Sequence, residues 1–239
     1  MSSRRKVTTS IIGINNDRYS IVIPSAGAGH RMRSYGPKSL IKIAGNTTII
    51  DRQLDIIKKI FTNCEIILVT GFCADKLMNH TPSDLIKVEN ENYENTNVLR
   101  SIGIGLRAAT TDKVLILYGD LVFNEEAIKN LKLDSSAIVV DSSGLMGELE
   151  VGCNISNGKV HQLLPDMPNK WGQMLFLTDK ELTIFKKISY DKNKGHYFGF
   201  EAINETIDRG GKFEAVHPKE MKITDVDSSK DFVTVKKII

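Results

Sequence analysis

A glycine-containing loop followed by a lysine is the segment of this sequence best suited to bind phosphate. The loop is Ser25-Ala26-Gly27-Ala28-Gly29-His30-Arg31-Met32, and Gly36-Pro37-Lys38-Ser39-Leu40 follows it. Glycines let backbone N–H groups approach phosphate oxygens without side-chain obstruction. Arg31 and Lys38 can then bring two cations to one polyphosphate. Isolated cations in loops are often only solvated, so the prediction depends on both halves occurring together.

Two common nucleotide-binding motifs fit this loop badly. A dinucleotide-binding loop needs a third glycine where this chain has Met32. A P-loop needs Gly-Lys followed by Ser or Thr, which this loop lacks. We therefore expect neither motif.

The elements that must position this loop are those of an α/β protein. Short apolar runs predict buried strands and longer amphipathic runs predict helices, and their alternation favours a mostly parallel sheet. The expected strands are Tyr19–Pro24, Glu65–Thr70, Lys113–Tyr118, Ala137–Val140 and Lys212–His217; the expected helices are Thr47–Phe61, Asn97–Ala109, Asp179–Ser189, Gly199–Arg209 and one from Ser228. After Gly144 the pattern changes to a hairpin, Leu149–Ile155 and Lys159–Leu164, with Asn157-Gly158 in its turn.

From these elements we expect a single Rossmann-like domain with a mostly parallel mixed sheet flanked by helices. Residues 19–239 would form the domain, residues 1–18 an N-terminal extension, and residues 145–178 a small β-rich lobe that covers the substrate. Asp120 follows a buried strand, and the loop from Ser25 to Arg31 follows another. Both should therefore lie at the sheet edge where ligands bind in open α/β folds.

Taken together, these motifs resemble the nucleotidyltransferases of the sugar-nucleotide and phosphocholine cytidylyltransferase type, which have a GT-A-like Rossmann fold. The resemblance rests first on Gly27–Met32 with Pro37–Leu40. It continues through Ile66–Phe72, Asn95–Asn97, Tyr118–Asp120 and Asp225–Phe232, and so covers nearly the whole chain. The chain departs from the family pattern at Pro24, Ser25 and His30.

This resemblance implies a Mg²⁺-dependent transfer of a nucleoside monophosphate from a nucleoside triphosphate to a small phosphorylated substrate, with release of pyrophosphate. A substrate phosphate is already an anionic nucleophile, so no Ser-His-Asp triad is needed. The implied catalytic residues are Arg31, Lys38 and Asp120; the implied nucleotide-binding residues are Ser25, Ala26, Gly27, Ala28, Gly29, Thr70, Gly71 and Asn97; the implied metal ligands are Asp120, Asp227 and, as a third, Asp225.

Plainer interpretations of these acids stay open. Asp120 after Gly119 could be a turn residue. Asp225 could precede a helix N-terminus, where acids are favoured. Mg²⁺ usually takes one or two carboxylates, with water and phosphate completing its octahedron, and Asp120 with Asp227 meets that need.

The nucleotide and the acceptor are less determined. The segment Tyr93–Ser101 looks most like cytidylyltransferases, which favours CTP, although Asn95–Asn97 could be a plain helix cap. Since no Glu-Lys-Pro motif occurs, a sugar 1-phosphate with UTP or dTTP is the second choice. Trp171, Tyr197 and Glu201, with Phe198 and Phe200, could hold a cationic head group, although aromatics at this spacing are more often core.

Composition excludes several other classes. The net charge of only +3 does not mark the chain as a polybasic nucleic-acid binder, and no apolar run reaches a membrane span. The three cysteines form no metal-binding pattern, which fits a reducing, cytoplasmic compartment. A homodimer is one option. A glycosyltransferase would show Asp-x-Asp where this chain has Tyr118-Gly119-Asp120, and a non-catalytic nucleotide sensor would be expected to lose its metal carboxylates.

Overall fold

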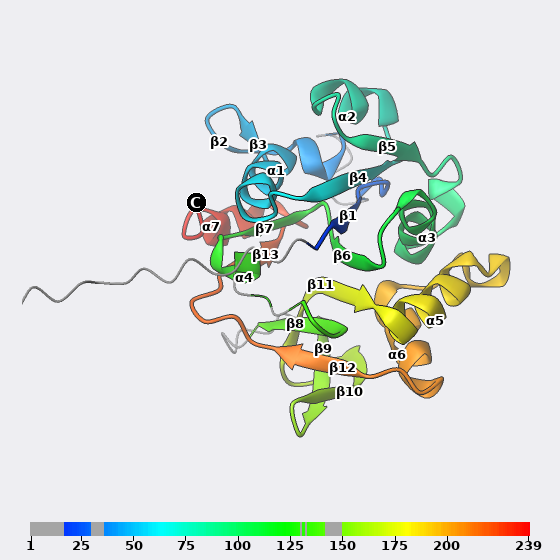
Figure 1. The fold of residues 1–239 in the computed structure, drawn as a ribbon. Coiled ribbons are helices and arrows are strands. Elements are labelled where there is room, and N and C mark those ends of the chain that lie inside the picture. Colours follow the sequence, from blue (N-terminus) through cyan, green and yellow to red (C-terminus); the bar gives the residue numbers. More distant parts are fainter. Residues whose placement is uncertain (1–16, 30–35, 130, 132, 142–149) are drawn as a thin grey trace, which may run out of the picture.

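A nine-stranded mixed sheet forms the centre of the protein. The computed structural model describes residues 17–29, 36–129, 131, 133–141 and 150–239 (Figure 1). The strand order is β5-β4-β1-β6-β11-β8-β12-β10-β9. These strands are β1 (Tyr19–Pro24), β4 (Cys64–Thr70), β5 (Ile86–Glu89), β6 (Lys113–Leu117), β8 (Ala137–Asp141), β9 (Val151–Ser156), β10 (Lys159–Pro165), β11 (Lys170–Thr178) and β12 (Phe213–Val216). Two small sheets pair β7 (Leu121–Phe123) with β13 (Ile223–Asp225), and β2 (Lys42–Ala44) with β3 (Thr47–Thr48).

Helices cover both faces of the sheet. They are α1 (Ile49–Ile60), α2 (Ala74–His80), α3 (Val98–Ala108), α4 (Glu126–Lys129), α5 (Asp179–Tyr190), α6 (Gly199–Asp208) and α7 (Phe232–Val235), with 3-10 turns η2 (Lys38–Leu40), η3 (Tyr93–Asn95), η4 (Lys192–Lys194) and η5 (Ser229–Asp231). The apolar run of β1 is continuous because both faces of this strand are covered by helices. Ile21 and Ile23 pack in the cluster with α1, whereas Val22 packs in the cluster with α3 and α5.

The α/β prediction is confirmed, but the sheet is parallel only in part. Strands β5, β4, β1 and β6 run parallel. Beyond β6, β11 is antiparallel to both of its neighbours β6 and β8, and β10 is antiparallel to β12. The sheet is therefore mixed, because β10 and β11, from the later part of the chain, run opposite to their neighbours.

The segment expected as a small β-rich lobe contributes its strands to the main sheet. Strands β9 and β10 extend it at one edge, while β11 lies in its middle between β6 and β8 (Figure 1). The sequence pattern missed β11 because Gly172 and Gln173 interrupt its apolar run. The C-terminal helix expected from Ser228 is shorter than predicted, with η5 followed by the four residues of α7. The expected domain limits remain predictions.

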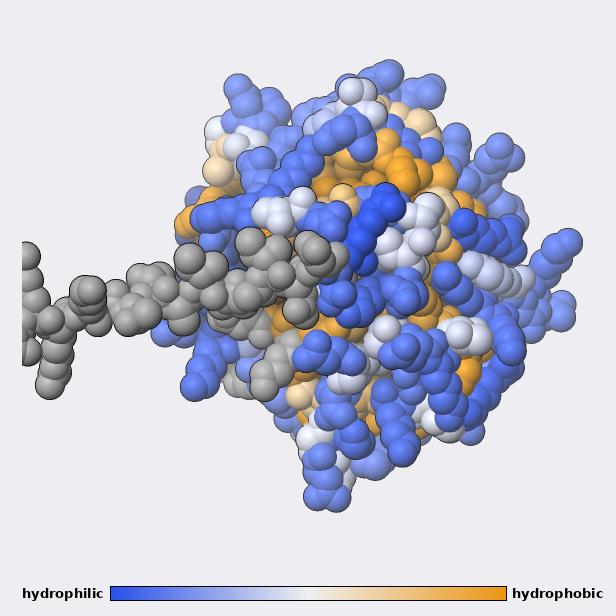
Figure 2. Space-filling view, in the orientation of Figure 1, coloured by the Kyte–Doolittle hydropathy of each residue, from blue (hydrophilic) through white to orange (hydrophobic). Residues whose placement is uncertain are grey.

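The surface in Figure 2 is mostly polar, with apolar side chains visible between the charged ones. Among the described residues, no helix is both long and apolar enough to cross a membrane.

Candidate active site

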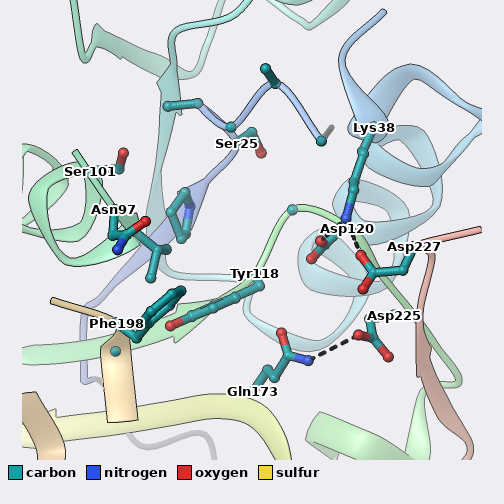
Figure 3. A pocket seen from close by; sticks show the side chains of 18 of the residues that line it. Ser25, Lys38, Asn97, Ser101, Tyr118, Asp120, Gln173, Phe198, Asp225 and Asp227 are labelled. Atoms are coloured by element: carbon teal, nitrogen blue, oxygen red, sulfur yellow. Dashed lines mark hydrogen bonds and ion pairs between the residues drawn. The ribbon is translucent and has the colours of Figure 1, made fainter. Parts of the chain in front are cut away.

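A cleft of about 1220 Å³ opens where β1 and β6 end. The loop after β1 and the turn after β6 form part of its wall, and the starts of α3 and α6, the first half of β11 and the region of β13 form much of the rest (Figure 3). The lining includes Ser25, Ala26, Gly27, Ala28, Gly29, Lys38, Asn97, Asp120, Trp171, Asp225 and Asp227 among the residues expected from the sequence. Segments far apart in the sequence thus meet at one sheet edge, as expected for ligands of open α/β folds.

The glycine loop is held by close backbone contacts to the neighbouring loops. The Ser25 N–H donates to the Val69 carbonyl at 2.8 Å, and the Phe72 N–H donates to the Ala26 carbonyl at 2.9 Å. A Cβ at Gly119 would lie 1.9 Å from the Ser25 hydroxyl oxygen. The loop after β6 can therefore approach the glycine loop only because position 119 has no side chain.

Lys38 contacts carboxylates from two distant segments of the chain. Its ammonium donates to Asp120 at 3.0 Å and also to Asp227, and its side chain is only 17 % exposed (Figure 3). Burial alone would lower the pKa of Lys38, but the charge of Asp120 and the contacts to Asp227 outweigh it and raise the pKa. Lys38 is therefore a fixed, fully charged cation. Gly29, with φ +54°, packs against its aliphatic chain.

Asp227 is positioned by the turn that follows β13. The backbone N–H groups of Asp227 and Ser228 donate to the Asp231 carboxylate at 2.8 and 2.6 Å. The Val226 N–H donates to the Asp120 carbonyl at 3.0 Å, which ties this turn to the segment after β6. The carboxylates of Asp120 and Asp227 therefore lie close enough together to contact the same Lys38 ammonium.

Asp225 lies at the edge of this group and has other neighbours. Its carboxylate accepts a bond from Gln173 at 3.4 Å and lies 3.9 Å from the Lys170 ammonium. Burial raises the pKa of Asp225; Lys170 opposes this effect, whereas the charges of Asp120 and Asp227 add to it.

The two carboxylates that contact Lys38 suit a small divalent cation. One ammonium nitrogen already contacts both Asp120 and Asp227, so both carboxylates can reach a single positive charge. In the described part of the chain, no group of three or more His, Cys, Asp and Glu side chains is arranged as a metal site. Mg²⁺ needs only one or two carboxylates when phosphate oxygens and water complete its shell, so this pair fits it.

The opposite wall of the cleft is organised by Asn90, which follows β5. Its buried amide donates to the hydroxyls of Thr96 and Ser101, both at 3.1 Å. The Asn97 N–H donates to the Gly195 carbonyl at 2.8 Å, which fixes the start of α3. Asn90, Thr96, Asn97 and Ser101 all line the cleft.

Two buried hydroxyls of the cleft lining have no partner among the described residues. They are the Ser25 Oγ and the phenolic oxygen of Tyr118. Burial, and secondly the charge of Asp120, raises the pKa of Tyr118, so its hydroxyl keeps its proton. Buried polar groups are normally paired, so these two hydroxyls are suited to bond a ligand in the cleft.

The residues expected to hold a cationic head group are not brought together. Trp171 is buried at the wall, with its ring edge-on to Tyr118 at 5.7 Å, whereas Tyr197 and Glu201 are not in the cleft lining. Lys194 lies over the Tyr197 ring at 5.4 Å. The Glu201 carboxylate accepts the Phe198 N–H at 2.7 Å and so caps α6. Of the aromatic residues considered, Phe198 and Phe200 do line the cleft.

Other expected residues lie behind the cleft or outside the described residues. Thr70 is fully buried and donates to the Val88 carbonyl, and Gly71 packs against Ala26. Arg31, with His30 and Met32, lies outside the described residues. Sequence reasoning missed Asn90, Ser101, Lys170 and Gln173. Only Asn90 had a usable signal, since it follows the short run that forms β5.

Proteins of similar sequence or fold are known for most of this chain. Residues 21–167 match the model of the MobA-like NTP transferase domain. No protein of curated function matches the chain in sequence. Among solved structures, the chain is similar to the inositol-1-phosphate CTP transferase from T. maritima, with 18 % identity, TM-score 0.74 and coverage of 92 % of this chain and 96 % of that one.

Two further solved structures have the same fold. The CTP:phosphocholine cytidylyltransferase from Streptococcus pneumoniae is 16 % identical, with TM-score 0.73 over 92 % of this chain and 98 % of that one. A nucleoside-diphosphate-sugar pyrophosphorylase from Vibrio cholerae is 13 % identical, with TM-score 0.69 over 91 % and 99 %.

Proposed function

We propose, since the chain belongs to the family of MobA-like NTP transferase domains, that it is a Mg²⁺-dependent cytidylyltransferase acting on a small phosphorylated acceptor. The chain is a nucleotidyltransferase that transfers a nucleoside monophosphate to a phosphorylated substrate. The proposal adds CTP as the nucleotide, Mg²⁺ as the metal, and the residues that form the site.

The observation that carries the proposal is the contact of Lys38 with both Asp120 and Asp227. A fixed cation and two carboxylates at the end of the glycine loop are what transfer from a triphosphate requires. Bound Mg²⁺, held by Asp120 and Asp227, would neutralise charge on the reacting phosphates. Lys38 would supply a second positive charge to the same phosphates.

The transfer itself needs little covalent chemistry from the protein. An oxygen of the acceptor phosphate attacks the α-phosphorus of the triphosphate and forms the new P–O bond. The bond from the α-phosphorus to the bridging oxygen of the β-phosphate breaks, and pyrophosphate leaves with that electron pair. The chain's residues orient the two reactants in line and stabilise the negative charge that builds on the leaving group.

The choice of CTP rests on the Tyr93–Ser101 segment and on two proteins of like fold. Asn90, Asn97 and Ser101 offer amide and hydroxyl groups at the wall of the cleft that the start of α3 forms. Two proteins of similar fold are named as a CTP transferase and a CTP:phosphocholine cytidylyltransferase, which supports this choice. The second candidate is a sugar 1-phosphate with UTP or dTTP.

The first experiment is pyrophosphate release with Mg²⁺ across CTP, UTP, dTTP, ATP and GTP. Each is combined with phosphocholine, phosphoethanolamine, aminoethylphosphonate, polyol phosphates and sugar 1-phosphates. Lys38→Ala and Asp120→Asn are expected to lower turnover by a factor of about 10² or more, because both act on charge in the transition state. Exposed matched controls are Lys42→Ala and Asp84→Asn. Wild-type turnover in Lys38→Ala or Asp120→Asn would refute the site.

A further inference from the structure

Strand β11 carries a strained residue where it reaches the cleft. Gln173 has φ +54° although it lies inside a strand and carries a side chain. This left-handed conformation is unfavourable for residues with a Cβ, and such strain is found mostly at functional sites. A glycine would adopt the same backbone without strain.

The strain comes from an irregularity in the pairing of β11. Trp171 pairs with Val140 and Leu175 pairs with Ile138, so Gly172, Gln173 and Met174 all stand opposite one residue of β8. On the other side of β11, regular pairing with β6 begins at Met174 opposite Leu117. Bulges next to active sites re-aim side chains. This one sets Gln173 level with Tyr118, at the edge of the sheet where Asp120 emerges.

The side chain of Gln173 points into the cleft beside Asp225 (Figure 3). Its amide donates to the Asp225 carboxylate at 3.4 Å, which is long for a hydrogen bond. Lys170 on the same strand contacts Glu150 and lies 3.9 Å from Asp225. Around the amide, the Lys170 ammonium therefore faces two carboxylates, those of Glu150 and Asp225.

The Gln173 amide itself is suited to a neutral polar partner. An amide has two N–H donors and a carbonyl acceptor, and here one donor makes one long bond. A hydroxyl can both donate to that carbonyl and accept from an N–H, whereas a quaternary ammonium can do neither. The nearby Trp171 is buried and its indole N–H donates to the Met174 carbonyl at 3.4 Å, so it offers no open cage.

We propose that Gln173, set by the bulge in β11, is a specificity-determining residue that hydrogen-bonds a hydroxyl of the acceptor. The acceptor is then a hydroxyl-bearing phosphate, such as a polyol or cyclitol phosphate, and not a quaternary amine. This inference rests on the proposed function, since it names the substrate class of the same site.

The test is Gln173→Gly, which removes the amide and also relieves the strain. Acceptor binding is measured by titration calorimetry in the presence of a non-reactive CTP analogue and Mg²⁺, with a polyol phosphate and phosphocholine as probes. The matched control is Glu220→Gly, because Glu220 also has positive φ, is exposed and does not line the cleft. KM for acceptor and for nucleotide is measured in parallel.

The expected result is polyol phosphate binding about tenfold weaker in Gln173→Gly, from the loss of its hydrogen bonds. Its melting temperature and its KM for nucleotide should be preserved, and Glu220→Gly should bind acceptor as the wild type does. Equal acceptor binding by Gln173→Gly and wild type would overturn the inference, and so would a wild-type preference for phosphocholine. Intact acceptor binding without turnover in the wild type would count against the proposed function instead.

Discussion

Among single residues, Glu65 shows how a buried charge is kept in this fold. Its carboxylate accepts bonds from the Ser20 hydroxyl at 2.5 Å and from the N–H and hydroxyl of Thr110 at 2.6 and 2.7 Å. Burial alone would raise the pKa of Glu65, but these bonds and the Arg18 charge outweigh it and lower the pKa. Glu65 thus links β1, β4 and the turn after α3.

Glu65→Gln should destabilise the protein in a pH-dependent way. At neutral pH we expect a loss of about 2 kcal/mol, because the amide cannot accept the same set of bonds. A depressed folded-state pKa gives stability that is present above the unfolded value of about 4.3 and is lost as the pH falls through the folded value. Urea unfolding at pH 7 and below pH 4 measures this; a difference between variant and wild type that does not shrink in acid would contradict it.

Tyr118→Phe should leave the free protein as stable as the wild type or more stable. The Tyr118 hydroxyl is buried without a partner, and removing an unsatisfied polar group costs nothing in hydrogen bonds. Thermal unfolding of the ligand-free protein checks this. Ser20→Ala, which removes a buried and fully bonded hydroxyl, is the control and should melt lower. A clear drop for Tyr118→Phe would mean that the hydroxyl has a partner after all.

Among the elements, helix α3 determines the position of one cleft wall. It can lie close to β1 because Gly105 has no side chain. A Cβ at this position would come within 2.4 Å of Val22. The first turn of the helix carries Asn97 and Ser101 to the cleft. The distance between helix and sheet therefore sets the width of the site.

Gly105→Val should lower stability by about 3 kcal/mol through overpacking and should weaken nucleotide binding as α3 is pushed outward. Val22→Ala removes the methyl groups it would strike, so the double variant should recover part of both losses. Denaturant melts and nucleotide titrations on the four proteins of this cycle provide the measurement. Losses that simply add would contradict this prediction, because they would mean that Gly105→Val does not act through Val22.

The elements also show what sequence could predict. Strands with continuous apolar runs, such as β1 and β6, were expected within one residue of their observed limits. Lys38, Asp120 and Asp227 were expected as one site, and they meet there. Strand β11 and the part of the cleft wall that carries Gln173 were not expected. Their shape depends on the pairing of β11 with β6 and β8, a long-range contact without a local signature.

At the scale of the whole molecule, one ligand should bridge segments from most of the chain. The cleft lining runs from Pro24 to Asp231, so a bound triphosphate links the parallel and antiparallel parts of the sheet. Binding to the native state alone stabilises a protein by about 2.7 kcal/mol when ligand is present at 100 times its Kd.

CTP with Mg²⁺ together should therefore raise the melting temperature by several degrees, and more than either alone. The reason is that the carboxylate pair and the phosphates complete the metal shell jointly. Differential scanning fluorimetry with EDTA as the metal-free arm checks this. Asp227→Asn should reduce the joint shift, and Asp84→Asn should not. Equal shifts with and without metal would remove Mg²⁺ from the nucleotide site.

The pairing of Lys38 with Asp227 spans 189 positions of the chain. The ribosome adds about 5–20 residues per second, so Lys38 has been made well before Asp227, its second carboxylate partner. A nascent or prematurely ended chain can contain the glycine loop and Lys38, yet it lacks the Asp227 carboxylate that Lys38 contacts in the complete fold. Under the proposed role of Asp227, such partial products would not consume nucleoside triphosphate, because they end before the turn after β13.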